Sequence, residues 1–263
     1  MSPVKIVFFD LDGTLLDRQV RRFSEETVYA IEQLQKNGIK CCLVTGRPPA
    51  CLPKNMPLHF DVLSTFNGSL CYTDSEIIYS NPIDPADVRT VLANAAALGR
   101  PVSVAVRDRQ VSNGYDQDLA DYCRLAEQEL TVSPDFEETC REDVYQIMLG
   151  SREEEYSAII RNADRVKIAV SWERAVDVIP STGGKGTAIG HILAFFGFSP
   201  REAIAFGDGQ NDLEMFHAVG TGIAMGNASD KIKAEAHQVC GSVTRDGVYH
   251  YCVEQGLIPP KAF

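Results

Sequence analysis

Short apolar runs alternate along the first part of the chain with longer stretches in which apolar residues recur every three or four positions. The runs at residues 4–9 and 39–44 are typical of buried strands, and the stretch at residues 24–37 has the period of an amphipathic helix. Ser24 suits the N-cap of this helix, and Gly38 suits its end. A strand, a helix and a strand in this order predict a βαβ unit of a parallel sheet.

The last part of the chain repeats this alternation. We expect a helix from Lys185 to a stop at Gly197, and a short helix that begins at Ser229. Together, residues 1–81 and 183–263 predict one α/β unit with a doubly wound, Rossmann-like parallel sheet. The remaining elements expected here are strands at 203–206 and 221–225, a helix at 212–217 and an edge strand at 238–240.

Residues 82–182 have an alternation of their own. A loop of such length would be unusual, so we expect a second, smaller α/β domain inserted into the first. Its last two strands form a predicted hairpin, and Trp172 lies near the turn, where we expect it to pack. The pattern predicts helices at 85–98, 118–130 and 152–163, and strands at 102–106, 145–149, 166–170 and 175–179.

Composition narrows the class of protein. The 263 residues are 44% hydrophobic and 23% charged, as in soluble globular proteins. A formal net charge of −11 argues against a nucleic-acid partner. No apolar run approaches the roughly 18 residues of a membrane span, and the first residues lack a secretion-signal pattern, so we expect a cytoplasmic protein without membrane contact. The eight cysteines include no CxxC pair, and we expect reduced thiols.

Three of the predicted strands end on polar residues. The run at residues 4–9 is followed by Asp10 and Asp12, the run at 39–44 by Thr45 and Gly46, and the run at 203–206 by Gly207 and Asp208. Ligands of open parallel sheets bind at the carboxyl ends of the strands. The three strand ends therefore predict one site that contains at least three carboxylates.

Other nucleotide and metal motifs are missing. The first strand is followed by DLDGTL, which is not the glycine-rich dinucleotide fingerprint, and no phosphate-binding P-loop occurs. The acidic runs 10–14 and 208–212 lack the spacing of an EF-hand and its closing glutamate. These absences leave catalysis by the carboxylates as the leading interpretation.

The same residues resemble the ordered motifs of the haloacid dehalogenase superfamily, and the insert resembles the large α/β cap of its Cof-type phosphatases. The resemblance covers essentially the whole chain and implies a core of residues 1–81 and 183–263 with a cap of residues 82–182. The matching segments are Asp10-Leu-Asp-Gly-Thr14, Val44-Thr-Gly-Arg47, Asn67-Gly68, Lys185, Gly207-Asp-Gly-Gln-Asn-Asp212, Ala224-Met-Gly-Asn227 and Asp246-Gly-Val248.

Two carboxylates at one strand end allow two-step hydrolysis of a phosphate ester. Asp10 is placed to attack the phosphorus and to carry the phosphoryl group. Asp12 is the candidate acid for the leaving alcohol and then the base for the incoming water. Gly13 permits the sharp turn that brings both carboxylates to one centre.

The resemblance also implies cations and donors around the phosphoryl group. Mg²⁺ would be held by Asp10, the main-chain carbonyl of Asp12, and Asp208. Lys185 would supply a fixed positive charge. The other residues that this reading assigns are Thr45, Gly46, Asn67 and Asn211 at the phosphate or substrate and Asp212 in support of the metal or Lys185.

The expected activity is a Mg²⁺-dependent phosphatase acting on a small phosphorylated metabolite, either a sugar phosphate or a phosphorylated cofactor. A phosphomutase or phosphotransferase would need the same residues, and a phospho-accepting regulatory protein is a third hypothesis. The sequence leaves the oligomeric state open, a homo-oligomer included. We expect Arg47 to be a structural or rim charge, and the four prolines at 48–57 to shorten any helix there.

Overall fold

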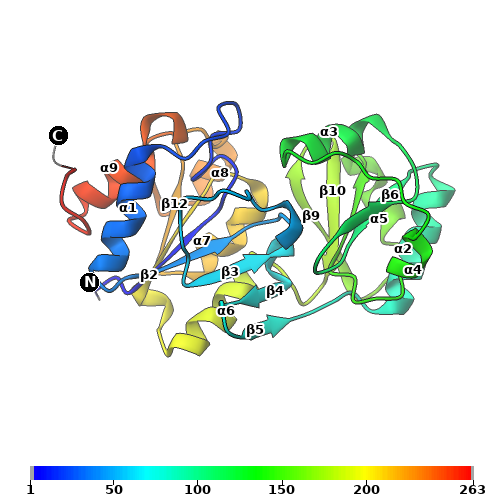
Figure 1. Ribbon diagram of the computed structural model, residues 1–263, viewed down its shortest axis with the longest axis horizontal. Coiled ribbons are helices and arrows are strands. Elements are labelled where there is room, and N and C mark those ends of the chain that lie inside the picture. Colours follow the sequence, from blue (N-terminus) through cyan, green and yellow to red (C-terminus); the bar gives the residue numbers. More distant parts are fainter. Residues whose placement is uncertain (1–2, 262–263) are drawn as a thin grey trace.

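The computed structural model describes residues 3–261, so the outermost residues of the predicted domain limits lie outside it. Two α/β units lie side by side, each with its own sheet (Figure 1). We call the unit with the eight-stranded sheet the core and the unit with the five-stranded sheet the insert. The strands of the insert all lie within residues 102–180; its predicted limits at residues 82 and 182 stay a prediction.

The core sheet has the strand order β13-β12-β11-β1-β2-β3-β4-β5. Neighbouring strands from β13 to β3 pair in parallel, and β4 and β5 continue the sheet antiparallel at one edge. The strands are β1 (Ile6–Phe9), β2 (Lys40–Val44), β3 (Val62–Thr65), β4 (Leu70–Tyr72), β5 (Ile77–Ser80), β11 (Ala203–Gly207), β12 (Thr221–Ala224) and β13 (Gln238–Val239).

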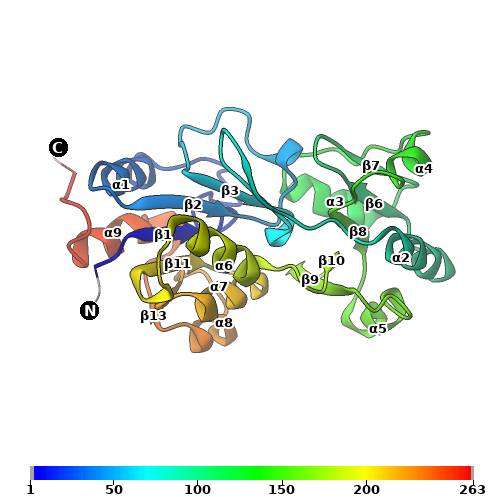
Figure 2. The same cartoon turned by 90° about the horizontal axis from the view of Figure 1, so that it is seen from below.

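Helices cover both faces of this sheet, as the alternation of β1 requires. Val7 and Phe9 pack in one buried cluster with α1 (Glu25–Lys36) and α9 (Gly247–Glu254). Phe8 packs on the opposite face with α6 (Lys185–Phe196). Figure 2 shows α6, α7 (Leu213–Ala218) and α8 (Asp230–Glu235) gathered on one side of the sheet and α1 on the other. The predicted doubly wound α/β fold is therefore confirmed.

The insert is an antiparallel sheet with the order β7-β6-β8-β10-β9. Helix α3 packs against β8 and lies toward the core, and Phe66 of the core joins Leu119 and Met148 of the insert in one buried cluster. The elements are α2 (Pro85–Ala97), β6 (Val102–Ala105), β7 (Gln110–Ser112), α3 (Gln117–Leu125), α4 (Phe136–Thr139), β8 (Gln146–Gly150), α5 (Tyr156–Ile159), β9 (Val166–Trp172) and β10 (Ala175–Pro180).

The predicted helix signals of the core hold, whereas two helices of the insert are shorter than predicted. Ser24 caps α1 by accepting from the amide of Thr27, and Gly197 ends α6 in the left-handed region. In the insert the chain turns through the left-handed region at Glu127 and Asn162, which ends α3 and confines α5 to one turn. The strands β3, β4, β5 and β7 were not predicted.

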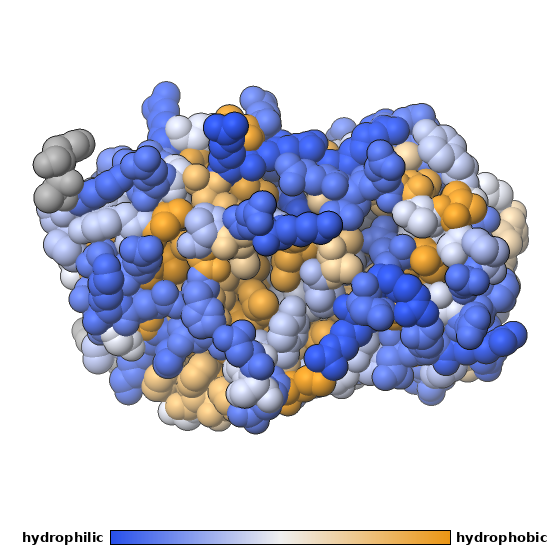
Figure 3. All heavy atoms as spheres, viewed as in Figure 1, coloured by the Kyte–Doolittle hydropathy of each residue, from blue (hydrophilic) through white to orange (hydrophobic). Residues whose placement is uncertain are grey.

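Several smaller expectations concern the surface and the thiols. All eight cysteines are free, and the proline-rich stretch forms only a single 3₁₀ turn (Pro49–Cys51). Within residues 3–261 no helix is both long enough and apolar enough to cross a membrane. Hydrophilic side chains dominate the face seen in Figure 3, and apolar ones form scattered patches between them.

Candidate active site

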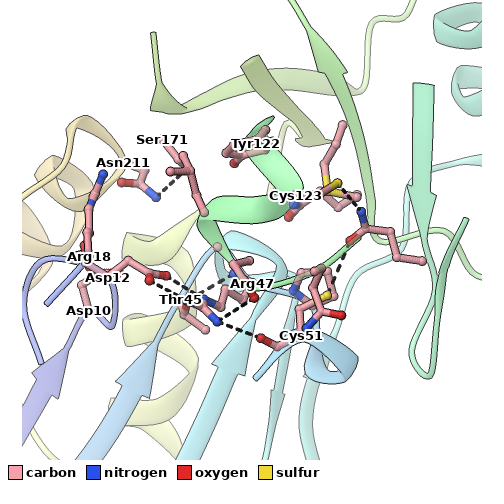
Figure 4. Close-up of a pocket in the computed structure, with 18 of the residues that line it drawn as sticks. Asp10, Asp12, Arg18, Thr45, Arg47, Cys51, Tyr122, Cys123, Ser171 and Asn211 are labelled. Carbon is pink, nitrogen blue, oxygen red and sulfur yellow. Dashed lines mark hydrogen bonds and ion pairs between the residues drawn. The ribbon is translucent and has the colours of Figure 1, made fainter. Parts of the chain in front are cut away.

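The sheet register brings the three predicted strand ends together. Phe9, the last residue of β1, pairs with Leu43 of β2 and with Phe206 of β11. The residues that follow these strands therefore share one edge of the sheet, at a pocket between core and insert (Figure 4). The predicted site residues that line this pocket are Asp10, Asp12, Thr45, Gly46, Asn211 and Asp212.

Lys185 forms ion pairs with two carboxylates beneath the pocket. Its Nζ lies 2.6 Å from Oδ1 of Asp10 and 2.6 Å from Oδ1 of Asp212, and its side chain is 1% exposed. Burial alone would lower the pKa of Lys185, but the two carboxylates outweigh burial and raise it above its usual value. Lys185 is therefore charged throughout the physiological range, which fits the role that the sequence predicts.

Lys185 alone does not keep the pKa values of Asp10 and Asp208 at their usual low level. Burial and the neighbouring Asp212 raise the pKa of Asp10 to about 8, against the opposing effect of Lys185. Burial also raises the pKa of Asp208 to about 6, and Arg18 opposes this shift. Carboxylate oxygens of Asp10, Asp208 and Asp212 lie within 4.8 Å of one another. Such a set of hard oxygen donors fits a divalent cation like Mg²⁺.

Two of the predicted metal ligands belong to this cluster, and the third, the main-chain carbonyl of Asp12, stays a prediction. Asp10 and Asp208 belong to it, whereas Asp12 contributes no carboxylate oxygen and Asp212 does. The Oδ2 atom of Asp212 accepts from the amides of Asp208 and Gly209 at 2.9 and 2.8 Å, and its Oδ1 pairs with Lys185. Asp212 thus holds the loop that carries Asp208, which fits its predicted supporting position.

Arg18 is a site residue that the sequence reasoning missed. Its Nε and Nη2 donate to the main-chain oxygen of Asp12 at 3.1 and 2.9 Å, and Nη2 lies 3.4 Å from Oδ2 of Asp208. Asp208 also lies 3.3 Å from Nδ2 of Asn227, in one of the segments that carry the resemblance. Arg18 follows the first motif in a loop without a periodic pattern, so no local signal marked it.

Gly13 has the positive φ that the predicted turn requires. Its φ is +92°, and a Cβ at this position would collide with the carboxylate of Asp208. The main-chain oxygen of Gly13 accepts from Nδ2 of Asn227 at 2.8 Å. Glycine is therefore needed for conformation and for space, and the prediction for this residue is confirmed.

Arg47 is neither at the rim nor remote from the reacting groups. Its guanidinium binds both carboxylate oxygens of Asp12, at 2.7 and 2.6 Å, and Arg47 is 6% exposed. Nη1 donates to the main-chain oxygens of Cys51 in the core and Ala126 in the insert. Of the two expected positions, a structural or a rim charge, Arg47 takes the structural one, because β2 ends inside the interface between the two units.

Asn67 and Asn211 belong to a buried polar network between core and insert. Nδ2 of Asn211 donates to Oδ1 of Asn67 at 2.9 Å and to Ser171 of the insert at 3.2 Å. Nδ2 of Asn67 in turn donates to Asp177 of the insert at 2.8 Å, and Tyr122 donates to the same carboxylate at 3.0 Å. Asn67 therefore lies behind the pocket wall, whereas Asn211 reaches the pocket.

Comparisons with known proteins agree with this geometry. The family model of the haloacid dehalogenase-like hydrolases matches residues 7–252 of this chain. The chain belongs to this family. The putative phosphatase YkrA of Bacillus subtilis is 30% identical over 97% of this chain and 98% of its own length. The predicted membership of the haloacid dehalogenase superfamily, in its Cof-type group, is thereby confirmed.

Two further similarities are to a second phosphatase and to a solved structure. The 5-amino-6-(5-phospho-D-ribitylamino)uracil phosphatase YitU of Bacillus subtilis is 29% identical, over 95% of this chain and 96% of its own. The solved structure of the subclass IIB sugar phosphatase BT4131 superposes with a TM-score of 0.90 at 27% identity, over 97% of this chain and 100% of that chain. The haloacid dehalogenase fold thus extends over core and insert alike.

The network of this family member contains one carboxyl group whose titration affects stability. Complete burial raises the pKa of Asp177 from 3.8 to about 7, although Asn67 and Tyr122 oppose the shift. Because the folded pKa is the higher one, the protonated carboxyl stabilises the fold below 3.8, and this contribution is lost as the pH rises through about 7.

We therefore expect Asp177→Asn to flatten the pH dependence of stability. The amide keeps an acceptor for Asn67 and carries no charge, so the variant should gain on the order of 3 kcal/mol relative to wild type between about pH 5 and about pH 8. Chemical unfolding at both pH values measures the difference. An unchanged difference between variant and wild type would show that Asp177 is already ionised at about pH 5 in the folded state, so that its pKa is not raised.

Proposed function

We propose that the chain is a Mg²⁺-dependent phosphatase that hydrolyses a small phosphorylated metabolite, a sugar phosphate or a phosphorylated cofactor, through a phosphorylated Asp10. The observation that carries the proposal is the carboxylate cluster of Asp10, Asp208 and Asp212, in which buried Lys185 pairs with Asp10 and Asp212. Relatives that are named as phosphatases of a sugar phosphate and of a phosphorylated ribitylaminouracil support it.

In the first step, a carboxylate oxygen of Asp10 attacks the phosphorus, and the bond between phosphorus and the ester oxygen breaks. Lys185 holds Oδ1 of Asp10, so the other oxygen is available for this attack. Asp12 gives its proton to the leaving alcohol. Both carboxylate oxygens of Asp12 accept from Arg47, so this acid step requires Asp12 to turn out of the pair.

In the second step, a water molecule loses a proton to Asp12 and attacks the phosphorus of the phosphorylated Asp10. Release of phosphate restores the Asp10 carboxylate and leaves Asp12 protonated for the next cycle. Thr45 and the amide of Gly46 line the pocket and would donate to the phosphoryl oxygens, as would Asn211. The insert covers the pocket and would act as a cap that excludes bulk water.

Asp10, Asp208 and the main-chain oxygen of Asp12 would hold the metal, with Asp212 in support. Bound Mg²⁺ would neutralise charge on the phosphoryl oxygens and keep the neighbouring carboxylates ionised. Arg18 binds two of these oxygen donors, on Asp12 and Asp208. The same oxygens cannot serve the guanidinium and the metal fully at once.

We therefore expect Arg18→Ala to bind Mg²⁺ more tightly and to be less stable without it. The side chain of Arg18 is 43% exposed, so the gain in affinity should be modest, about two- to fivefold. Calorimetric titration with Mg²⁺ measures the affinity, and thermal unfolding measures the stability without metal. Arg22→Ala, an exposed arginine of the same loop, serves as the control. Equal or weaker Mg²⁺ binding by Arg18→Ala would contradict the competition.

The proposed function is tested by phosphate release from a panel of sugar phosphates and phosphorylated cofactors. The assay is run with and without Mg²⁺, for wild type and Asp12→Ala, and with no added alcohol acceptor. Metal-dependent release that the variant loses supports hydrolysis. Release that requires an added alcohol would favour the phosphotransferase, and a folded, metal-binding protein that releases nothing would reject the phosphatase.

A further inference from the structure

We propose that the leaving group of this site is electrically neutral: an alcohol that carries hydroxyl or amide groups but no second phosphate and no carboxylate. This inference deepens the proposed function and depends on it. It rests on the part of the pocket that lies beyond the reacting carboxylates, where the insert forms the wall. The pocket is open to solvent, and residues of both units line it.

The wall contributed by the insert has polar groups without charge. Among the described residues that line the pocket, none from the insert carries a charged side chain. In Figure 4, Tyr122 and Cys123 of α3 lie above the strand ends that carry Asp10, Asp12 and Thr45. The lining residues of the insert are Gln110, Tyr122, Cys123, Leu125, Ala126, Gln128, Gln146, Met148 and Ser171.

The cations that line the pocket belong to the core, and both have partners there. Arg47 is paired through Nε and Nη2 with Asp12 and through Nη1 with two carbonyl oxygens. Arg18 is engaged with Asp12 and Asp208. Lys185 lies beneath the pocket on Asp10. These three cations lie on the core side of the pocket, beside the reacting carboxylates, and the wall of the insert adds no cation for a second anion.

Gln110 is the lining residue best placed to recognise a neutral polar group. Its Nε2 donates to the sulfur of Cys123 at 3.4 Å, and its Oε1 accepts from the thiol of Cys51 at 3.6 Å. Thiols are weak donors and weak acceptors, so Gln110 would form stronger hydrogen bonds with a hydroxyl or amide of a substrate than with the two thiols. Burial raises the pKa of both thiols to about 11, so neither offers a charge of its own.

A second anion would meet unfavourable surroundings at this wall. The hydroxyl of Tyr122 donates its hydrogen bond to Asp177 behind the wall, so it is not free to donate to a ligand. Gln146 already accepts from Asn67 at 3.3 Å, and Met148 and Leu125 are apolar. An anion buried without a cation is costly because it loses hydration without an opposite charge. The wall therefore selects against bisphosphates and phosphorylated acids.

The test measures competitive inhibition of p-nitrophenyl phosphate hydrolysis by matched ligands. Fructose 1-phosphate is compared with fructose 1,6-bisphosphate, and erythritol 4-phosphate with 4-phosphoerythronate. We expect the member with the neutral body to bind at least about tenfold more tightly in each pair. Equal inhibition, stronger inhibition by the charged members, or inhibition by neither would overturn the inference. Absence of any Mg²⁺-dependent hydrolysis of p-nitrophenyl phosphate would instead reject the proposed function.

A pair of variants shows whether the effect belongs to the wall. Gln110→Lys places a cation in the pocket and should tighten binding of fructose 1,6-bisphosphate relative to fructose 1-phosphate by about tenfold. Gln117→Lys adds the same charge to the exposed start of α3, outside the pocket, and should leave the ratio unchanged. An unchanged ratio in Gln110→Lys, or an equal shift in both variants, would contradict the assignment.

Discussion

Asp10→Asn is expected to lose phosphate release by about 10⁴-fold or more, with the fold retained. An amide of the same shape cannot act as the nucleophile, and it still offers an acceptor to Lys185, which keeps Asp212 as its other partner. The substitution also removes a carboxyl group whose pKa burial raises to about 8, so thermal stability should not fall. Release of phosphate from p-nitrophenyl phosphate with Mg²⁺ measures the effect.

Asp61→Asn is the control for this substitution. Asp61 lies just before β3, at the opposite edge of the same sheet, where it accepts from the amide of Cys41 and pairs with Lys40. It should keep full activity. An Asp10→Asn protein that retained wild-type turnover, in a preparation shown by its mass to contain no Asp10, would remove Asp10 from the mechanism.

Lys185→Met is expected to destabilise the protein by about 3–5 kcal/mol and to abolish activity. The substitution leaves Asp10 and Asp212 buried together without the cation that lies 2.6 Å from each. The loss should shrink as the pH is lowered, because protonation removes the uncompensated negative charge. Chemical unfolding at about pH 5.5 and about pH 8 measures both the loss and its sign.

Lys167→Met is a matched control, because Lys167 is a partly exposed lysine of β9 that pairs with Glu214 at 2.6 Å. A pair of this kind contributes up to about 1 kcal/mol. If Lys185→Met and Lys167→Met destabilised the protein equally, Lys185 would not be the buried charge on which the site depends.

The sequence allowed the core and the strand-end carboxylates to be predicted because their signals are local. Apolar runs, the cap at Ser24 and the stop at Gly197 are short-range patterns, and parallel pairing brings strand ends to one edge. Asp10 and Asp208 could be placed in one site by this reasoning. Asp10 and Asp208 are 198 residues apart in the chain, and they lie close together because they follow the neighbouring parallel strands β1 and β11.

The remaining site residues could not be predicted because they lie in an irregular loop or act across the interface between the two units. Arg18 comes from an irregular loop, and Asp177 lies in a strand of the insert that reads as an ordinary alternating strand. Arg47 was expected to be a structural or rim charge, and the sequence did not show which; it is buried, and its Nη1 donates to the carbonyl oxygen of Ala126 in the insert. Contacts of this kind depend on how the insert lies on the core, which no short-range pattern records.

The central claim is that Asp10 carries the phosphoryl group, and one measurement tests it most directly. Asp12→Asn is mixed with p-nitrophenyl phosphate and Mg²⁺, quenched in acid and digested, and the peptide masses are determined. p-Nitrophenolate leaves without an acid catalyst, whereas the water step still needs a base, so the phosphorylated enzyme should accumulate. The account predicts one phosphoryl group on the peptide that contains Asp10. Steady release of p-nitrophenolate with no phosphoryl group on that peptide would contradict it.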